Sequence, residues 1–183
     1  KSMIKTGFFE KDITPPLGCS ISGYFNIRLG SGIKDKLYAK AIVISNKETI
    51  DIISIDACSV TEESCKIITD RIEKYTGINK KNILITATHS HTAGPIIKDN
   101  SEGRDAALDA LYIDYMRTAA ADCAIFAYHN MQPSYLKYTS GNVEGISFIR
   151  NYIMKDGSLR TNPGRLNPEI VKPYGEIDTE LSI

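Results

Sequence analysis

Two histidines stand one residue apart near the middle of the chain, directly after an apolar run. Residues 82–88 are rich in strand-forming side chains, and His89 and His91 follow them. In an extended chain, residues i and i+2 point to the same face, so both imidazoles would project together if the strand continued through the pair. Neutral imidazole is the commonest metal ligand in proteins, and zinc sites use it routinely. The pair therefore predicts a hydrolytic metal site.

The simpler interpretation of the pair is structural: two polar residues at a strand end, hydrogen-bonded to main-chain carbonyls. Two imidazoles alone do not complete a site, because a catalytic zinc ion usually has three protein ligands. The third histidine of the chain, His129, ends a predicted helix, where a cation interacts favourably with the helix dipole. Asp56 ends a predicted strand. Either its carboxylate orients a histidine, or the residue begins the turn into the next helix.

Two further regions carry residue types that suit a binding site. Residues 18–34 are rich in Gly and Ser and are predicted to form a long irregular loop, a type of loop that is often functional. Its aromatic residues, Tyr24 and Phe25, either line a hydrophobic substrate slot or pack beneath the loop. Arg150 has the fork of donors that suits a carboxylate or phosphate, although isolated arginines usually lie on the surface.

The first part of the chain predicts strands. Residues 5–14 alternate loosely between apolar and polar side chains and end at a pair of prolines, which suits an N-terminal strand closed by a turn. Residues 36–45 and 49–55 are apolar and are separated by three polar residues, which predicts a hairpin.

A helix is predicted between this hairpin and the histidine pair. Ser59 and Glu62 have capping-box spacing, and apolar residues then recur at helical intervals up to Gly77. Residues 49–88 therefore predict a strand–helix–strand unit, whose two strands should run parallel.

A second and longer helix is predicted for residues 105–130. Its larger apolar residues are expected to share one broad face, with small alanines filling close contacts. Residues 134–143 are predicted to form another strand, and Asp156-Gly157 a hairpin turn. The predicted apolar face of the helix consists of Leu108, Leu111, Tyr115, Cys123 and Phe126.

Together these elements predict an α/β fold with a mixed β-sheet flanked by helices. Residues 1–183 are expected to form one domain, in which residues 150–183 are irregular and either disordered or completed by further sequence. The last residues resemble a strand that begins where the sequence stops. This is an unusual place for a domain to end.

Composition argues against several classes of protein. Lys+Arg and Asp+Glu both number 22, and this balance gives no support to a nucleic-acid partner. No apolar run approaches the length that spans a bilayer, so no transmembrane segment is predicted. The four cysteines lack CxxC spacing and are expected to be reduced and mostly buried. Residues 1–7 contain no signal-peptide h-region, so a cytoplasmic location is expected. Secretion is also compatible with the sequence, because a removed signal peptide would leave no trace. The sequence is equally compatible with a homo-oligomer.

Five segments in a fixed order carry a more specific signal than any single motif. They are residues 12–18, 23–24, 32–41, 85–95 and 154–164. Together they resemble the N-terminal domain of the neutral/alkaline (non-lysosomal) ceramidase family, and the last segment resembles the bacterial, ceramidase-like branch. The resemblance implies a zinc-dependent hydrolase that cleaves an N-acyl amide, such as ceramide, to a fatty acid and an amine.

The resemblance also implies roles for individual residues. His89 and His91 are the implied metal ligands, and the implied cofactor is Zn²⁺. His91 and Arg150 are the implied catalytic residues, although Ile149 replaces the asparagine that precedes this arginine in the family. The implied partner is a small-molecule or lipid amide. The family's remaining zinc ligands and its serine nucleophile are expected after Ile183. The resemblance therefore implies an incomplete catalytic domain, which is expected to be inactive alone.

Two rival classes of protein remain: another metal-dependent hydrolase, and a non-catalytic domain. Metallo-β-lactamase-like enzymes and amidohydrolase-like barrels also carry HxH after a strand. The first normally continues as HxHxDH, a pattern that residues 92–94 break, and the second needs eight βα units, which 183 residues hardly supply. The other class is a non-catalytic domain that is retained for assembly and whose histidines are structural.

Overall fold

Alternation of buried and exposed side chains organises a five-stranded sheet. β1 (Ile4–Asp12), β2 (Tyr38–Ser45) and β3 (Thr49–Ile55) are successive antiparallel neighbours. β4 (Ile83–Ala87) pairs with β3 in parallel, and β5 (Gln132–Ser134) pairs with β1, so the strand order is β4-β3-β2-β1-β5. The predicted α/β class, the hairpin and the parallel strand–helix–strand unit are confirmed.

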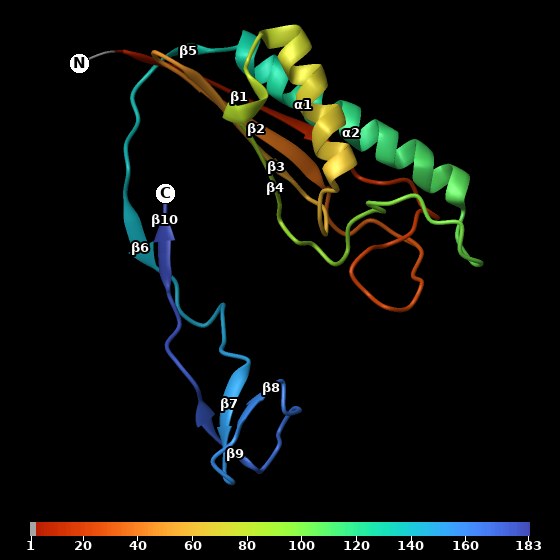
Figure 1. The fold of residues 1–183 in the computed structure, drawn as a ribbon, viewed down its shortest axis with the longest axis vertical. Helices are drawn as coiled ribbons and strands as arrows, with labels where there is room; N and C mark the ends of the chain where they lie inside the picture. Colours follow the sequence, from red (N-terminus) through yellow and green to blue (C-terminus); the bar gives the residue numbers. More distant parts are fainter. Residues whose placement is uncertain (1–2) are drawn as a thin grey trace. The chain divides into compact units, whose positions relative to one another are not determined.

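The computed structural model describes residues 3–183. These residues divide into two units, of which the first ends at Tyr135 and the second comprises Leu136–Ile183. The five-stranded sheet and both α-helices belong to the first unit (Figure 1). The histidine pair also belongs to that unit, and Arg150 belongs to the second.

The first helix, α1 (Glu62–Thr76), has its N-cap two residues later than the sequence predicted. The hydroxyl of Thr61 accepts a hydrogen bond from the main-chain amide of Ser64 at 3.2 Å, and the helix ends at Gly77. The predicted cap at Ser59 is therefore wrong, because Thr61 supplies the oxygen that satisfies a free amide of the first turn.

The second helix, α2 (Ala106–His129), packs directly on β1 and β2, and α1 packs beside it on the same side of the sheet (Figure 1). Gly7 of β1 allows this approach, because a Cβ at that position would collide with the main-chain oxygen of Ala127. Neither helix of the described residues combines the length and the apolar character needed to cross a membrane.

The apolar face predicted for α2 is largely wrong. Leu111, Tyr115 and Phe126 are exposed, although Cys123 is buried. The helix lies so close to the sheet that its small residues make the contact, and the larger side chains flank it. The buried apolar residues of this helix are Tyr112, Ile113, Met116, Ala119, Ala120, Ala121, Cys123, Ala124 and Ala127.

The opposite face of the sheet carries an apolar row. Phe8 pairs with Ile42, Ile42 with Ile52, and Ile52 with Leu84, so one side chain from each of four strands aligns across the sheet. Phe8 is 63% exposed and Leu84 is 55% exposed. Both described helices cover the other face, where the buried core lies.

In the second unit, β7 (Asn151–Met154) lies between β8 (Leu159–Thr161) and β9 (Ile170–Pro173). β7 and β8 are antiparallel and are joined through Asp156-Gly157, so the predicted hairpin is confirmed.

Residues 134–143 do not form the single strand that the sequence predicted. β5 ends at Ser134, and β6 (Ser140–Asn142) is a separate strand that pairs with β10 (Glu180–Ser182) in the second unit. The polar residues and the glycine of this stretch favour two short strands over one continuous strand.

One acidic side chain lies inside the helix-covered face of the sheet. Asp51 of β3 is fully buried, and neither of its carboxylate oxygens has a hydrogen-bond partner among the described residues. Because burial penalises the ionised form, the pKa of Asp51 is raised from 3.8 to about 7. The folded chain therefore holds a proton on Asp51 that the unfolded chain releases at lower pH.

We expect Asp51 to make the fold less stable as the pH rises. The unfolded chain ionises this carboxyl near pH 3.8 and the folded chain near pH 7, so its contribution to the free energy of unfolding falls between these values. Asp51→Asn should flatten this decline, whereas Glu48→Gln in the exposed β2–β3 turn should not. Urea denaturation at about pH 5 and about pH 8 measures both effects. An unchanged pH dependence in Asp51→Asn would contradict this account.

Candidate metal centre

The histidine pair begins where the parallel strands β3 and β4 end. Main-chain hydrogen bonds continue beyond both strands, from the amides of Thr88 and Ser90 to the carbonyls of Ile55 and Ala57, at 3.0 and 3.2 Å. His89 lies between these two bonds and has a left-handed φ of 59°. This conformation costs a non-glycine residue roughly 1–2 kcal/mol and persists only where the surroundings impose it. The strand therefore does not continue through the pair, and the same-face argument from the sequence is wrong.

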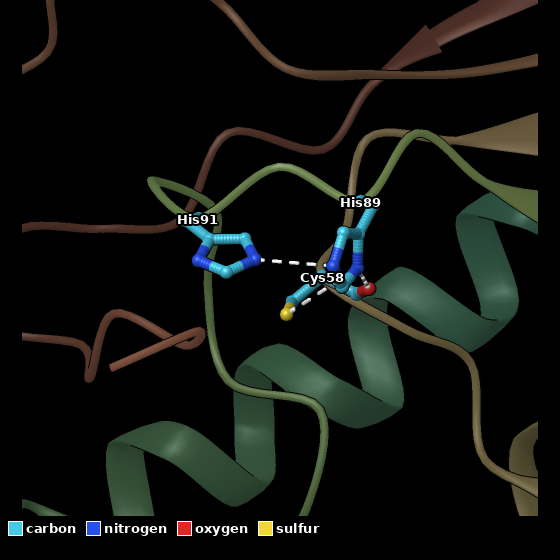
Figure 2. A group of neighbouring side chains, drawn as sticks. All are labelled: Cys58, His89 and His91. Carbon is cyan, nitrogen blue, oxygen red and sulfur yellow. Dashed lines mark hydrogen bonds between the residues drawn. The ribbon is translucent and has the colours of Figure 1, made fainter. Parts of the chain in front are cut away.

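The two imidazoles nevertheless converge, for a different reason. The Nδ1 of His89 lies 2.7 Å from the main-chain oxygen of Cys58 and must be the donor, because a carbonyl only accepts. The Nε2 of His89 then carries the lone pair, and the Nε2 of His91 lies 3.2 Å from it. The rings are nearly perpendicular, at 84°, and Figure 2 shows the two Nε2 atoms facing one another.

This spacing fits a shared metal ion. A tetrahedral ion bound at about 2.0–2.1 Å separates two nitrogen ligands by roughly 3.3–3.4 Å, close to the 3.2 Å observed between the two Nε2 atoms. The thiol of Cys58 adds a third ligand atom, and one ligand atom from each of Cys58, His89 and His91 lies within 4.8 Å of the others (Figure 2). Imidazole and thiolate are the ligands that zinc prefers, so this donor set could hold a zinc ion.

The 18–34 loop packs against His91. A guanidinium nitrogen of Arg28 donates to the main-chain oxygen of His91, and the same guanidinium stacks 3.9 Å from the ring centre of Tyr24. The Tyr24 ring in turn meets the His91 ring edge-on, with centroids 5.8 Å apart. Gly23 completes the contact, because a Cβ there would lie only 2.6 Å from Cγ of His91. Together these contacts restrict the position of the His91 ring.

The other candidates from the sequence lie in ordinary structural positions. Asp56 accepts a hydrogen bond from the main-chain amide of Tyr38 at 2.8 Å, whereas the oxygen that orients His89 is the carbonyl of Cys58. His129 is the last residue of α2, as expected for a cation at a helix C-terminus. Arg150 is exposed and directly precedes β7 in the second unit.

Sequence reasoning missed Cys58 as part of the site. All four cysteines are free, as predicted, and Cys58 is only half-buried. A signal was present: Cys58 follows β3 by three residues and His89 follows β4 by two, and the carboxyl ends of parallel neighbours meet at one edge of a sheet. Scattered spacing along the chain concealed this proximity, because only the parallel pairing creates it.

The chain matches one family of known sequences and resembles solved structures of ceramidases in its fold. A family model described as neutral/alkaline non-lysosomal ceramidase, N-terminal, matches residues 5–154. The crystal structure of neutral ceramidase from Pseudomonas aeruginosa has a similar fold, with a TM-score of 0.70 and 18% sequence identity, over 100% of this chain and 29% of that one. A structure of a ceramidase complexed with C2 gives a TM-score of 0.58 and 19% identity, over 85% of this chain and 25% of that one.

A search of curated protein sequences found no match. The chain spans less than a third of the length of either structural relative. The open sheet order and the family match also set aside the barrel and metallo-β-lactamase alternatives.

We expect Gly23→Ala to displace His91. The alanine would have an unfavourable φ of +101°, and its methyl group would lie 2.6 Å from the imidazole, so the ring must shift from its present position beside His89. Gly18→Ala is the matched control, because its φ is +92° but its Cβ makes only an ordinary 3.6 Å contact with Leu108. Imidazole nitrogen chemical shifts measured by NMR should change for His91 in Gly23→Ala alone. Equal changes in both variants would show that backbone strain, and not the contact with His91, is responsible.

Proposed function

We propose a function for this chain from its family, because it belongs to the neutral/alkaline non-lysosomal ceramidases. The proposal is that it forms the N-terminal part of a zinc-dependent hydrolase that cleaves an N-acyl amide, such as ceramide, to a fatty acid and an amine. One observation supports this above the others: two imidazole nitrogens lie 3.2 Å apart, and a hydrogen bond to the Cys58 carbonyl sets the tautomer of one of them.

His89 is the proposed anchor of the ion. Its Nδ1 keeps its proton and donates it to the carbonyl of Cys58, so the Nε2 of the neutral ring presents a lone pair to the site. The main-chain bonds on either side of His89 hold its backbone, and the bond to the Cys58 carbonyl holds its ring, which together reduce the conformational entropy that binding must overcome. When bound, zinc supplies Lewis-acid polarisation of the amide carbonyl and a lowered pKa for a water molecule.

His91 has two proposed roles, as a ligand through Nε2 and as a group that moves a proton at Nδ1. Its ring is held by packing against Tyr24 and Gly23, and its main chain by Arg28. Imidazole suits proton transfer because its ordinary pKa lies near neutrality. Arg150 is proposed to stabilise the oxygen of the amide as negative charge develops on it.

The proposed partner is a small-molecule or lipid amide. The four free thiols fit a reducing compartment, so we also propose a cytoplasmic location. The further zinc ligands and the nucleophile that the reaction requires are proposed to come from the remainder of the protein, so the 183-residue chain alone should not catalyse hydrolysis.

We expect His89→Ala to abolish zinc binding and, in the complete enzyme, amide hydrolysis. Zinc affinity measured by calorimetry tests the metal site independently of activity. Cys58→Ser is the matched control, because it keeps the main-chain carbonyl that orients His89 and removes only the thiol. The control should lose less zinc affinity than His89→Ala. An equal loss would show that the sulfur contributes as much to zinc binding as the imidazole of His89. Zinc retained at full affinity by His89→Ala would refute the proposed site.

A further inference from the structure

A cavity of about 320 Å³ lies between the N-terminal turn and the 18–34 loop. This volume falls at the small end of the range for ligand pockets, which is about 300–1,000 Å³. Neither Tyr24 nor Phe25 lines it, although both were candidates for a substrate slot. Most of the side chains that line it are apolar, among them Leu17, Cys19, Ile21, Ile33 and Leu37.

The walls of this cavity are fixed by hydrogen bonds. The amide of Gly18 donates to the carbonyl of Gly30, and the amide of Gly30 donates to the carbonyl of Cys19, at 2.8 and 2.9 Å. Ser20 is fastened to α2, because its amide and hydroxyl both donate to the buried carboxylate of Asp109, at 2.9 and 2.6 Å. The cavity is therefore preformed, which lowers the entropy that a ligand must overcome.

The lining suits hydrocarbon. The hydroxyl of Thr14 already accepts a hydrogen bond from the amide of Leu37 at 3.0 Å. Burial raises the pKa of the Cys19 thiol to about 11, so this group is neutral at physiological pH. The charged residues on the lining, Lys34 and Asp35, are exposed and opposite in sign. An aliphatic chain would thus displace water from the cavity without breaking hydrogen bonds of the walls.

The cavity adjoins the segment that carries the histidine pair. Thr92, which directly follows His91, is part of its lining, and the amide of Ser22 donates to the carbonyl of Ala93 at 3.1 Å. We propose that this cavity binds the aliphatic chain of the substrate and so sets which chain lengths are accepted. This inference rests on the proposed function, because it assumes that the polar end of the substrate lies at His89 and His91.

The test uses the 183-residue chain with octanamide and acetamide as probes, and calorimetry as the measurement. Gly32→Leu adds a side chain on the cavity lining, where a Cβ meets no atom within 4 Å and φ is not left-handed. Gly141→Leu makes the same addition in β6, with the same freedom, outside the cavity. Ile33→Ser removes an exposed apolar side chain from the lining and should leave the fold intact.

Octanamide should bind more tightly than acetamide by about fourfold for each methylene that the cavity buries. Gly32→Leu should weaken octanamide binding by at least about tenfold and Ile33→Ser by several-fold, whereas Gly141→Leu should match the wild type. Equal affinity for the two amides would overturn the proposal, and so would wild-type octanamide affinity in both Gly32→Leu and Ile33→Ser.

A further variant separates this inference from the proposed function. His89→Ala should keep the preference for octanamide over acetamide, because that preference comes from the cavity, whose lining does not include the imidazole. If the wild type binds octanamide but not zinc, the cavity assignment stands and the metal site fails. If it binds zinc but does not prefer octanamide to acetamide, the cavity assignment is overturned and the metal site stands.

Discussion

The candidate metal centre depends on the parallel pairing of β3 and β4 and on its continuation past both strand ends. This pairing brings the main chain after β3 beneath the main chain after β4, so that the carbonyl of Cys58 meets Nδ1 of His89. A single main-chain oxygen thus sets the tautomer of the imidazole. Main-chain geometry can impose this arrangement more rigidly than a side chain with rotatable bonds, and the left-handed conformation of His89 is the strain that accompanies it.

The second constraint is the attachment of the 18–34 loop to the rest of the first unit. Asp109 of α2 holds Ser20 at one point, and the carbonyl of Ala93 holds Ser22 at another. Directly after these anchors, Gly23 and Tyr24 pack on His91. Other residues of the same loop form one wall of the apolar cavity. One anchored loop therefore positions the His91 imidazole of the candidate metal centre and bounds the apolar cavity.

Most helices and strands of the first unit could be predicted from the sequence, because each depends on residues that lie close together along the chain. The hairpin, the parallel strand–helix–strand unit and the long helix all follow from periodicity and turn residues. The buried face of α2 could not be predicted in this way, because the close approach to the sheet at Gly7 selects small side chains over larger ones. The convergence of His89 and His91 was predicted for the wrong reason, since it depends on a main-chain conformation that periodicity does not encode. Cys58 joins the site through strand pairing, so its position after a predicted parallel strand was the only signal, and its distance from the histidines along the chain concealed it.

X-ray absorption spectroscopy of the zinc-loaded chain tests the central claim most directly, because it counts the imidazoles bound to the ion. If the facing Nε2 atoms of His89 and His91 hold the metal, the spectrum will contain two imidazole rings whose nitrogens lie about 2.0–2.1 Å from zinc. A shell of oxygen ligands alone, or one that contains a single imidazole, would contradict the account.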